Sequence, residues 1–254
     1  ERLNLAMQDA QIVIHAAALK HVDMAEYNPF ECIKTNVIGA ENIISCALNN
    51  NIEKVIALST DKASSPANLY GATKLLSDKL FIAANNYKGK NKIKFSVVRY
   101  GNVMGSRGSV IPLFLKQKKE KFFTVTDPSM TRFNITLQQG VEFVLFALKE
   151  MLGGEIFVPK LKSYKLETLV KAISSKAKIK YIGLRSGEKK HEEMISVNDA
   201  VNTAEFSNHF VILPNSEFYK LNLEKYMKIK KSKKVKSDFS YNSYTNKEYL
   251  NSKD

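Results

Sequence analysis

Short apolar runs alternate with stretches of helical periodicity along the first hundred residues. Three runs have the length and composition of buried strands, at residues 12–18, 54–59 and 94–103. Between them, residues 29–50 and 69–86 repeat apolar side chains at helical spacing. This order of strands and helices predicts a parallel sheet with right-handed crossover connections.

The second half of the chain alternates less regularly. Helical periodicity returns at residues 140–152 and 165–177, and short strand-like runs lie at residues 153–160, 178–183 and 209–214. The predicted fold class is therefore α/β, with a Rossmann-type parallel sheet and a smaller C-terminal lobe. We place the sheet in residues 1–101, and the lobe with returning sheet elements in residues 102–220.

Polar segments follow the three N-terminal strands. They read HAAALKHV from His15, STDK from Ser59 and YGNVMGSRG from Tyr100. Ligands of open parallel sheets bind outside the carboxyl ends of the strands. The three segments are therefore predicted to share one crevice.

Composition narrows the class of protein. The chain has 254 residues, of which 44% are hydrophobic, and contains no apolar run of the ~18 residues that a membrane helix needs. The first residues show no secretory signal. Cys32 and Cys46 lie in helical sequence without metal-ligand spacing. These features predict a cytoplasmic protein with no membrane partner.

Positive charge is concentrated near the C-terminus. The formal net charge is +14, and residues 221–254 contribute +5 of it, from nine Lys and four acidic residues. The run KIKKSKKVK at residues 228–236 is compatible with binding to nucleic acid or anionic lipid. Basic runs are more often solvated, so we interpret residues 221–254 as a flexible tail and predict no nucleic-acid partner.

A Tyr-x-x-x-Lys pattern supplies the first candidate chemistry. It occurs three times, at Tyr70/Lys74, Tyr226/Lys230 and Tyr249/Lys253. The first pair opens a helix directly after a strand that ends in STDK. Side chains four apart share a helical face, and a nearby ammonium favours a phenolate that can accept a proton from an alcohol.

The four histidines offer no metal site. His15, His21, His191 and His209 are too far apart in sequence to form a helical ligand pair. We therefore predict that the protein holds no metal.

Six motifs, in order, resemble those of a known enzyme family. They are HAAALKHV, TNVIGAEN, STDKASSPANLYGATK, RYGNVMGSRGSV, DPSMTRF and RSGEKKHEEM. Together they resemble the extended short-chain dehydrogenase/reductases that dehydrate UDP-N-acetylglucosamine, within the polysaccharide biosynthesis protein family. The likeness is greatest to the soluble inverting 4,6-dehydratases that begin pseudaminic acid synthesis for flagellin glycosylation.

The resemblance implies a mechanism for the STDK segment and its tyrosine. Tyr70 would take the C4 hydroxyl proton while NADP accepts the hydride, and Lys74 would hold the cofactor. Lys62 would then remove the C5 proton, Asp61 would protonate the departing C6 hydroxyl, and Thr60 would assist at the C4 oxygen. An acid and a base side by side suit an elimination.

The same resemblance assigns binding roles to further residues. Those near the cofactor would be Ala16, Ala17, Ala18, Lys20, Asn36 and Val103. Those around UDP-N-acetylglucosamine would be Lys20, Asn102, Arg107, Thr131, Arg132, Arg185 and Glu188. Arginine suits a diphosphate because its planar fork pairs with two oxygens. Homo-oligomers are usual in the family and are expected here.

One family hallmark is absent from this sequence. The family opens with a strand, a G-x-G-x-x-G turn and a helix, and the resemblance implies that the N-terminal βα units are missing here. Alternative interpretations therefore stay open. They are a retaining 4,6-dehydratase or a C4 epimerase of capsule or O-antigen synthesis, a non-catalytic fragment that binds a UDP-sugar, and a nucleic-acid binder.

Overall fold

A seven-stranded sheet forms the body of the protein in a computed structural model that describes residues 1–214 and 221–253. The first four strands in spatial order pair in parallel, and the three pairings that follow along the sheet are antiparallel. In spatial order they are β1 (Ile12–His15), β2 (Lys54–Thr60), β3 (Lys94–Tyr100), β7 (Ile156–Pro159), β12 (His209–Ile212), β11 (Thr203–Glu205) and β13 (Lys233–Lys234). The predicted α/β class with a parallel sheet is confirmed.

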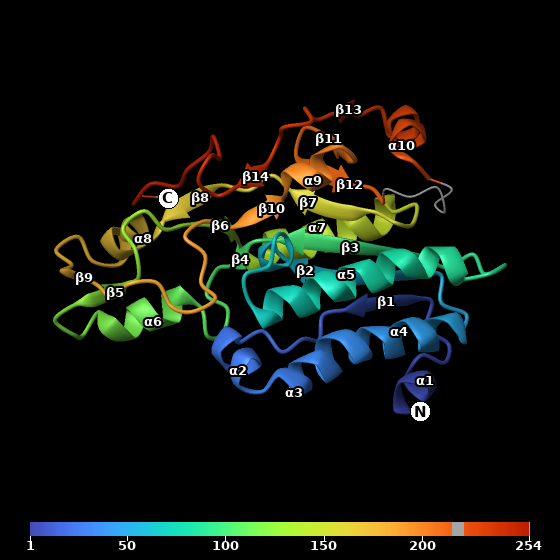
Figure 1. The fold of residues 1–254 in the computed structure, drawn as a ribbon, viewed down its shortest axis with the longest axis horizontal. Helices are drawn as coiled ribbons and strands as arrows, with labels where there is room; N and C mark the ends of the chain where they lie inside the picture. The colour runs from blue at the N-terminus through green and yellow to red at the C-terminus, as the bar shows by residue number, and fades with distance from the viewer. Residues whose placement is uncertain (215–220, 254) are drawn as a thin grey trace.

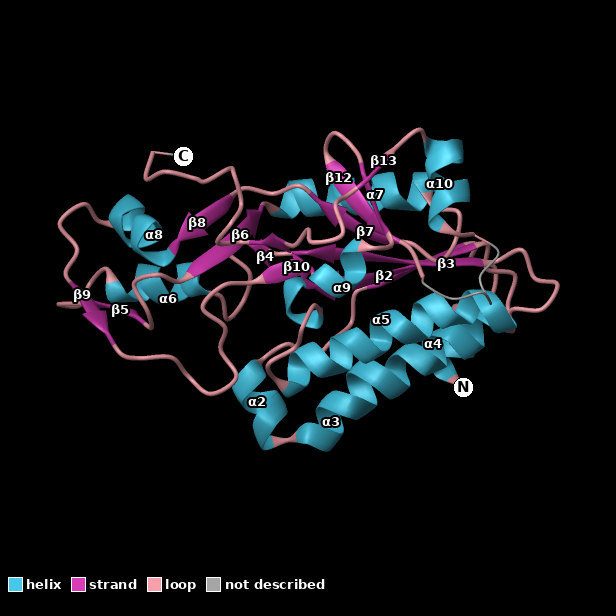
Figure 2. Cartoon of the chain, turned by 45° about the horizontal axis from the view of Figure 1, so that its top comes forward, coloured by secondary structure: helices cyan, strands magenta, loops and turns pink. Residues whose placement is uncertain are grey.

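Helices cover both faces of this sheet (Figures 1 and 2). Helices α4 (Gly39–Leu48) and α5 (Leu69–Tyr87) lie on one face, and α7 (Leu137–Glu150) and α10 (Leu223–Lys230) on the other. Along β2, Val55 and Ala57 pack toward the first pair while Ile56 packs toward the second. Alternate residues of a strand face opposite sides, so a strand covered on both faces reads as a continuous apolar run. In the described part of the chain, no helix has the length and apolarity to cross a membrane.

The predicted helix over residues 29–50 is divided into three pieces. Helix α3 (Pro29–Ile33) continues through a π-helical turn (Lys34–Ile38) into α4. The buried Asn36 lies in that turn, where its side-chain amide accepts a hydrogen bond from Leu19 N at 2.8 Å and donates one to Leu19 O at 2.9 Å. The wide turn thereby fixes the loop after β1. Two short helices that the pattern did not predict, α1 (Arg2–Ala6) and α2 (Val22–Tyr27), flank β1.

A smaller lobe lies beyond the carboxyl ends of the parallel strands (Figure 1, left). It has its own apolar core around Phe114, Phe123 and Val170. Its helices are α6 (Val110–Gln117) and α8 (Leu166–Ile173), and its strands are β4 (Asn102–Val103), β5 (Phe123–Val125), β6 (Thr131–Ile135), β8 (Ser163–Lys165) and β9 (Ile179–Tyr181). The segment that returns from this lobe to the body contains β10 (Glu193–Ile195) and α9 (Val197–Ala200).

The C-terminal segment departs from the flexible tail that its charge predicts. Residues 221–253 contain α10, β13 and β14 (Tyr241–Asn242), and β14 pairs with β10. Tyr226, Tyr241 and Ser243 are buried. Aromatic side chains that look isolated in a polar sequence therefore anchor the segment, and its lysines stay on the outer side. Residues 215–220 of the predicted lobe and residue 254 of the predicted tail lie outside the described residues.

One buried histidine gives the fold a pH dependence. His209 stacks on Phe206 with ring centroids 4.3 Å apart, and burial, helped by the Lys160 cation, lowers its pKa from 6.5 to about 4. Between pH 6.5 and 4 this histidine is protonated in the unfolded chain but not in the folded chain. The free energy of unfolding therefore falls as the pH drops from about 6.5 toward 4. The expected loss at this site approaches ~3 kcal/mol. Chemical denaturation across this pH range should show a flatter dependence for His209→Phe, and an unchanged dependence would contradict the assignment.

Candidate active site

The carboxyl ends of β1, β2 and β3 open into one cavity of about 670 Å³. The loops that follow the three strands line it, as the sequence predicts, and residues 185–189 with Glu192 complete its wall. Most of the predicted site residues lie on its wall: Ala16, Ala18, Lys20, Thr60, Asp61, Lys62, Tyr70, Lys74, Asn102, Val103, Arg132, Arg185 and Glu188. The cavity therefore unites segments as far apart in the chain as Ala16 and Glu192.

Four predicted site residues are not part of that wall. Ala17 and Arg107 are exposed, and Asn36 is buried behind the loop after β1. The hydroxyl of Thr131 lies 2.8 Å from His191 Nδ1 and 2.7 Å from Ser243 Oγ, so it points into the packing of the C-terminal segment. Asn36 and Thr131 thus hold neighbouring segments in place, and direct contact of these four with a ligand stays a prediction.

Helix α5 carries Tyr70 and Lys74 into the cavity from its first two turns. Its N-cap is Asn68, whose side-chain oxygen accepts a hydrogen bond from Gly71 N at 2.8 Å. The Leu69 amide donates to the Glu26 carboxylate at 2.7 Å. Capping and the helix dipole both favour these acceptors at an N-terminus. The position of Tyr70 is therefore set by the cap as well as by packing.

Gly71 allows α5 to approach the turn that carries Asp61 and Lys62. A Cβ atom at Gly71 would lie 2.3 Å from Lys62 O and 3.1 Å from Pro66 Cβ. Gly71→Ala is therefore expected to destabilise the fold by about 1–3 kcal/mol, because the backbone has to move apart. The matched control is Gly140→Ala in α7, where the new Cβ meets no atom closer than 4.0 Å. Equal unfolding free energies for the two variants, measured in denaturant, would contradict this prediction.

Tyr70 and Lys74 differ in their electrostatic surroundings. Burial raises the pKa of Tyr70 to about 12, against the opposing effects of the Lys62 cation and a hydrogen bond with Thr60. Lys74 Nζ donates to Leu58 O at 2.7 Å, and burial lowers its pKa although Asp78 opposes this. The ammonium that favours the phenolate is thus Lys62, whereas the sequence pattern pointed to Lys74.

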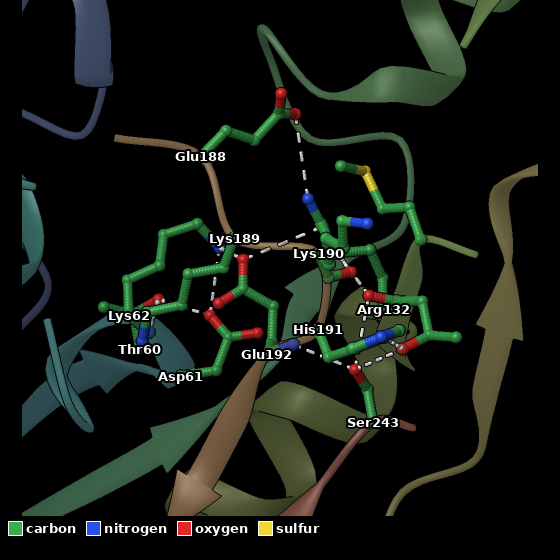
Figure 3. A network of polar contacts seen from close by, with 12 residues as sticks. Thr60, Asp61, Lys62, Arg132, Glu188, Lys189, Lys190, His191, Glu192 and Ser243 are labelled. Atoms are coloured by element: carbon green, nitrogen blue, oxygen red, sulfur yellow. Dashed lines mark hydrogen bonds and ion pairs between the residues drawn. The ribbon is translucent and has the colours of Figure 1, made fainter. Parts of the chain in front are cut away.

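Three charged side chains form the centre of the cavity floor (Figure 3). Lys62 Nζ lies 3.0 Å from Asp61 Oδ1 and 3.1 Å from Glu192 Oε1. The side chains of Asp61 and Glu192 are 1% and 3% exposed, whereas that of Lys62 keeps 22%. Asp61 Oδ2 and Glu192 Oε2 are buried without a hydrogen-bond partner in the described structure. The lysine is thus bracketed by two carboxylates and still reaches the open cavity.

The triad formed by Lys62, Asp61 and Glu192 favours the protonated form of Lys62. Burial opposes the charge of Lys62, but the carboxylates of Asp61 and Glu192 outweigh it and raise the lysine pKa. Burial raises the pKa of Asp61 despite the Lys62 cation. For Glu192, burial is outweighed by the Lys62 and Arg132 cations, which hold its pKa below the ordinary value. Asp61 is therefore the carboxylate better placed to receive a proton from Lys62.

Residues 185–189 form a further part of the cavity wall, and Glu192 of the triad belongs to the same segment. Arg132 lies between two glutamates of this segment, with Nη2 3.7 Å from Glu188 and Nε 3.7 Å from Glu192. The Asn68 side-chain amide donates to Gly187 O at 2.8 Å. Asn68 therefore both caps the tyrosine helix and fixes this wall. Across the cavity, Asn102 Oδ1 is buried without a partner in the described structure, so it can accept a hydrogen bond from a ligand.

Sequence reasoning missed Asn68 and Glu192. Asn68 could have been found, because Asn directly before an apolar periodic run is a typical N-cap. Glu192 lies in the quoted RSGEKKHEEM motif, but two adjacent glutamates look alike in sequence and only packing shows which one is buried. Among residues 1–214 and 221–253, no three His, Cys, Asp or Glu side chains gather in a way that could hold a metal ion.

Comparison with known proteins adds a family and a fold to this geometry. The family described as polysaccharide biosynthesis protein matches residues 1–214. The X-ray structure of Pen from Bacillus thuringiensis superposes with a TM-score of 0.86 at 37% identity, over 99% of this chain and 76% of that one. The expected family membership is thereby confirmed.

Among the curated relatives that align with almost the whole chain, two named activities occur. The UDP-N-acetylglucosamine 4,6-dehydratase (inverting) of Campylobacter jejuni strain 81-176 is 51% identical over 260 residues, which cover 100% of this chain and 77% of the relative. The UDP-glucose 4-epimerase of Rickettsia bellii is 43% identical over 95% of this chain and 72% of that relative. Dehydration and epimerisation are therefore the two chemistries between which the site has to be judged.

Proposed function

Because this chain belongs to the polysaccharide biosynthesis protein family, we propose that it is a hydro-lyase that removes water from UDP-N-acetylglucosamine to give a 4-keto-6-deoxy sugar nucleotide. The observation that carries this proposal is the buried contact between Asp61 and Lys62, 3.0 Å apart, in the cavity that also receives Tyr70. An acid and a base held together within reach of one ligand are what an elimination requires.

The chain's own residues supply the proton transfers. Tyr70 accepts the C4 hydroxyl proton as the alcohol becomes a ketone, with the Lys62 cation favouring the phenolate and Thr60 placed beside the same oxygen. The new ketone acidifies the C5 proton, which Lys62 removes as a free amine. Asp61 then protonates the departing C6 hydroxyl. Burial raises the pKa of Asp61, which favours this role as an acid.

The same cavity would receive a nicotinamide cofactor. Ala16 and Ala18 line it with small side chains, as do Tyr70 and Lys74, and the Lys74 ammonium uses one of its three donors on Leu58 O. Lys74 can therefore also hold ribose hydroxyls, and Val103 would line the same site. When bound, the cofactor would accept the hydride from C4 and later deliver it to C6.

The triad favours dehydration over epimerisation. A C4 epimerase needs a base for the C4 hydroxyl and a cofactor, but no acid for a leaving group at C6. Asp61 and Glu192 are buried around Lys62, and each retains an oxygen without a hydrogen-bond partner in the described structure. Burial of two carboxylates is costly unless they serve the reaction or are fully paired. Because some curated relatives are named epimerases, epimerisation is the alternative result in the experiment below.

Finer assignments rest on the motif resemblance and extend the same proposal. We propose NADP as the cofactor, inversion at C5, a cytoplasmic homo-oligomer, and a place at the start of pseudaminic acid synthesis for flagellin glycosylation. Arg185, Arg132 and Asn102 would hold the UDP moiety, with Glu188 accepting from ribose hydroxyls. Lys20, at the rim of the same cavity, would pair with phosphate.

Mass spectrometry separates the two activities directly. We expect the full-length protein, given UDP-N-acetylglucosamine with NADP or NAD, to convert the sugar nucleotide into a product that has lost one water. Epimerisation leaves the mass unchanged, so a C4 epimer of equal mass would replace dehydration by the alternative. Binding without any conversion, under conditions where the cofactor also binds, would favour the non-catalytic interpretation.

A further inference from the structure

Glu192 contacts the proposed base but has no role in the mechanism above. Its Oε1 atom lies 3.1 Å from Lys62 Nζ, the ammonium that Asp61 also contacts, and its side chain is 3% exposed (Figure 3). Its neighbour Glu193 accepts a hydrogen bond from Ser65 Oγ at 2.8 Å and lies outside the triad. Of two adjacent glutamates, only one therefore faces the reacting groups.

The backbone of Glu192 is held from behind by the C-terminal segment. Glu192 N donates to Ser243 Oγ at 2.9 Å, and Ser243 N donates to Glu192 O at 2.7 Å. Ser243 Oγ also lies 2.7 Å from Thr131 Oγ1, next to Arg132. Ser243 thus holds the backbone of Glu192, and the cations of Lys62 and Arg132 hold its carboxylate.

The proposed elimination requires Lys62 to lose and then regain a proton. Lys62 first passes one proton to Asp61 across their 3.0 Å hydrogen bond, which leaves an amine and a neutral acid. The amine takes the C5 proton, and the C5–H electron pair becomes the C5=C6 double bond. The C6–O bond breaks, and Asp61 gives its proton to the leaving hydroxyl, which departs as water. The pair ends as ammonium and carboxylate, the charge state with which it began.

We propose, on the basis of the dehydratase function above, that Glu192 is a positioning residue whose negative charge holds the Lys62 side chain against Asp61. Misplacing a reacting group by about 1 Å can cost ~10²-fold in rate, so a buried carboxylate that fixes the lysine matters even though its charge also favours the ammonium. Glu192 is ionised in the resting site, because the Lys62 and Arg132 cations outweigh the burial that would raise its pKa.

Other charged groups also act on Lys62, so a test has to isolate Glu192. The groups that interact with the ammonium are Asp61, Glu192, Arg132, Lys20, Lys189, Tyr70 and Tyr164. Glu192→Gln changes one negative charge and nearly preserves shape. Glu193→Gln is the matched control, since the same change is made one residue away. Glu192→Asp keeps the charge at a shorter reach and should restore part of what Glu192→Gln loses.

The first experiment measures turnover and the transient absorbance of the reduced cofactor in the full-length protein. In Glu192→Gln we expect turnover to fall by about 10²-fold, as when a reacting group is misplaced by about 1 Å, with KM and the initial cofactor reduction preserved. Glu193→Gln should behave as the wild type. Equal turnover in the two variants, or loss of the initial cofactor reduction in Glu192→Gln, would overturn the proposal.

The second experiment does not depend on dehydration. Reductive methylation of Lys62 at a fixed pH, followed by peptide mass spectrometry, reports the fraction of free amine. Removing the Glu192 charge lowers the lysine pKa, so Lys62 should react several-fold faster in Glu192→Gln than in Glu193→Gln. Equal rates in variants with equal thermal midpoints would overturn the proposal. A wild type that makes no keto sugar would refute the dehydratase function, and the methylation result would still decide the role of Glu192.

Discussion

Elimination is expected to stop when Lys62 is replaced by methionine, while oxidation at C4 continues. Among the described residues, Lys62 is the lysine paired with Asp61, 3.0 Å away on the cavity floor, so its loss removes the base for the C5 proton. General bases typically contribute 10²–10⁴-fold, and we expect turnover to fall by about 10³-fold. Reduced cofactor should accumulate on mixing with UDP-N-acetylglucosamine, because the oxidised sugar no longer loses water. It should form more slowly than in the wild type, because the cation that favours the Tyr70 phenolate is gone.

Lys62→Arg separates the loss of the base from the loss of the charge. Methionine leaves Asp61 and Glu192 buried without their cation, which also affects folding. Arginine keeps a cation between the carboxylates, but its guanidinium does not deprotonate in proteins. Both variants should therefore accumulate reduced cofactor. Normal turnover in Lys62→Arg would remove Lys62 from the role of base.

The first oxidation is expected to fail when Tyr70 is replaced by phenylalanine. The ring of Tyr70 is 8% exposed and packs with Ala25 and Cys32, so phenylalanine should preserve the packing and remove only the hydroxyl. Without an acceptor for the C4 proton, we expect turnover to fall by about 10³-fold and no reduced cofactor to form. Stopped-flow absorbance distinguishes this variant from Lys62→Met, in which reduced cofactor builds up.

The tyrosine prediction has its own control in the C-terminal segment. Tyr226 also precedes a lysine by four residues, but it is buried against the face of the sheet that α7 covers and lies far from the cavity wall. Tyr226→Phe should therefore leave cofactor reduction intact. If Tyr70→Phe reduced the cofactor at the wild-type rate, another group would have to accept the C4 proton.

Much of the sheet could be predicted because its strands are covered on both faces. Residues 55–58 are a continuous apolar run, residues 94–100 contain Phe95, Val97 and Val98, and the helix between the two strands carries clear periodicity. The short strands β5, β8 and β10 have three residues each, and their pairing depends on partners far away in the chain. The local sequence pattern does not indicate which distant segment a short strand will pair with. The order in the C-terminal segment was not predicted for the same reason, because Tyr241 of β14 pairs with Ile195 of β10, far earlier in the chain.

Site residues could be predicted where they follow the end of a strand. They were harder to predict where neighbouring residues point to opposite sides and only one of them faces the cavity. Asp61, Lys62 and Tyr70 lie where the loops after parallel strands converge. Thr131 looks like a site residue because it precedes Arg132, yet neighbouring residues of a strand point to opposite faces, and its hydroxyl turns toward Ser243. Glu192 could not be chosen over Glu193 until the packing of β10 and β14 was known.

The most direct test of the proposed function follows the sugar in deuterated water. The full-length protein is incubated with UDP-N-acetylglucosamine and NADP, and the product is analysed by proton NMR. Lys62 and Asp61 acting on C5 and C6 predict a 4-keto-6-deoxy sugar that carries deuterium at C5, with the configuration at C5 inverted. A C4 epimer that retains hydrogen at C5 and oxygen at C6 would contradict the account, because neither residue of the pair would then have acted.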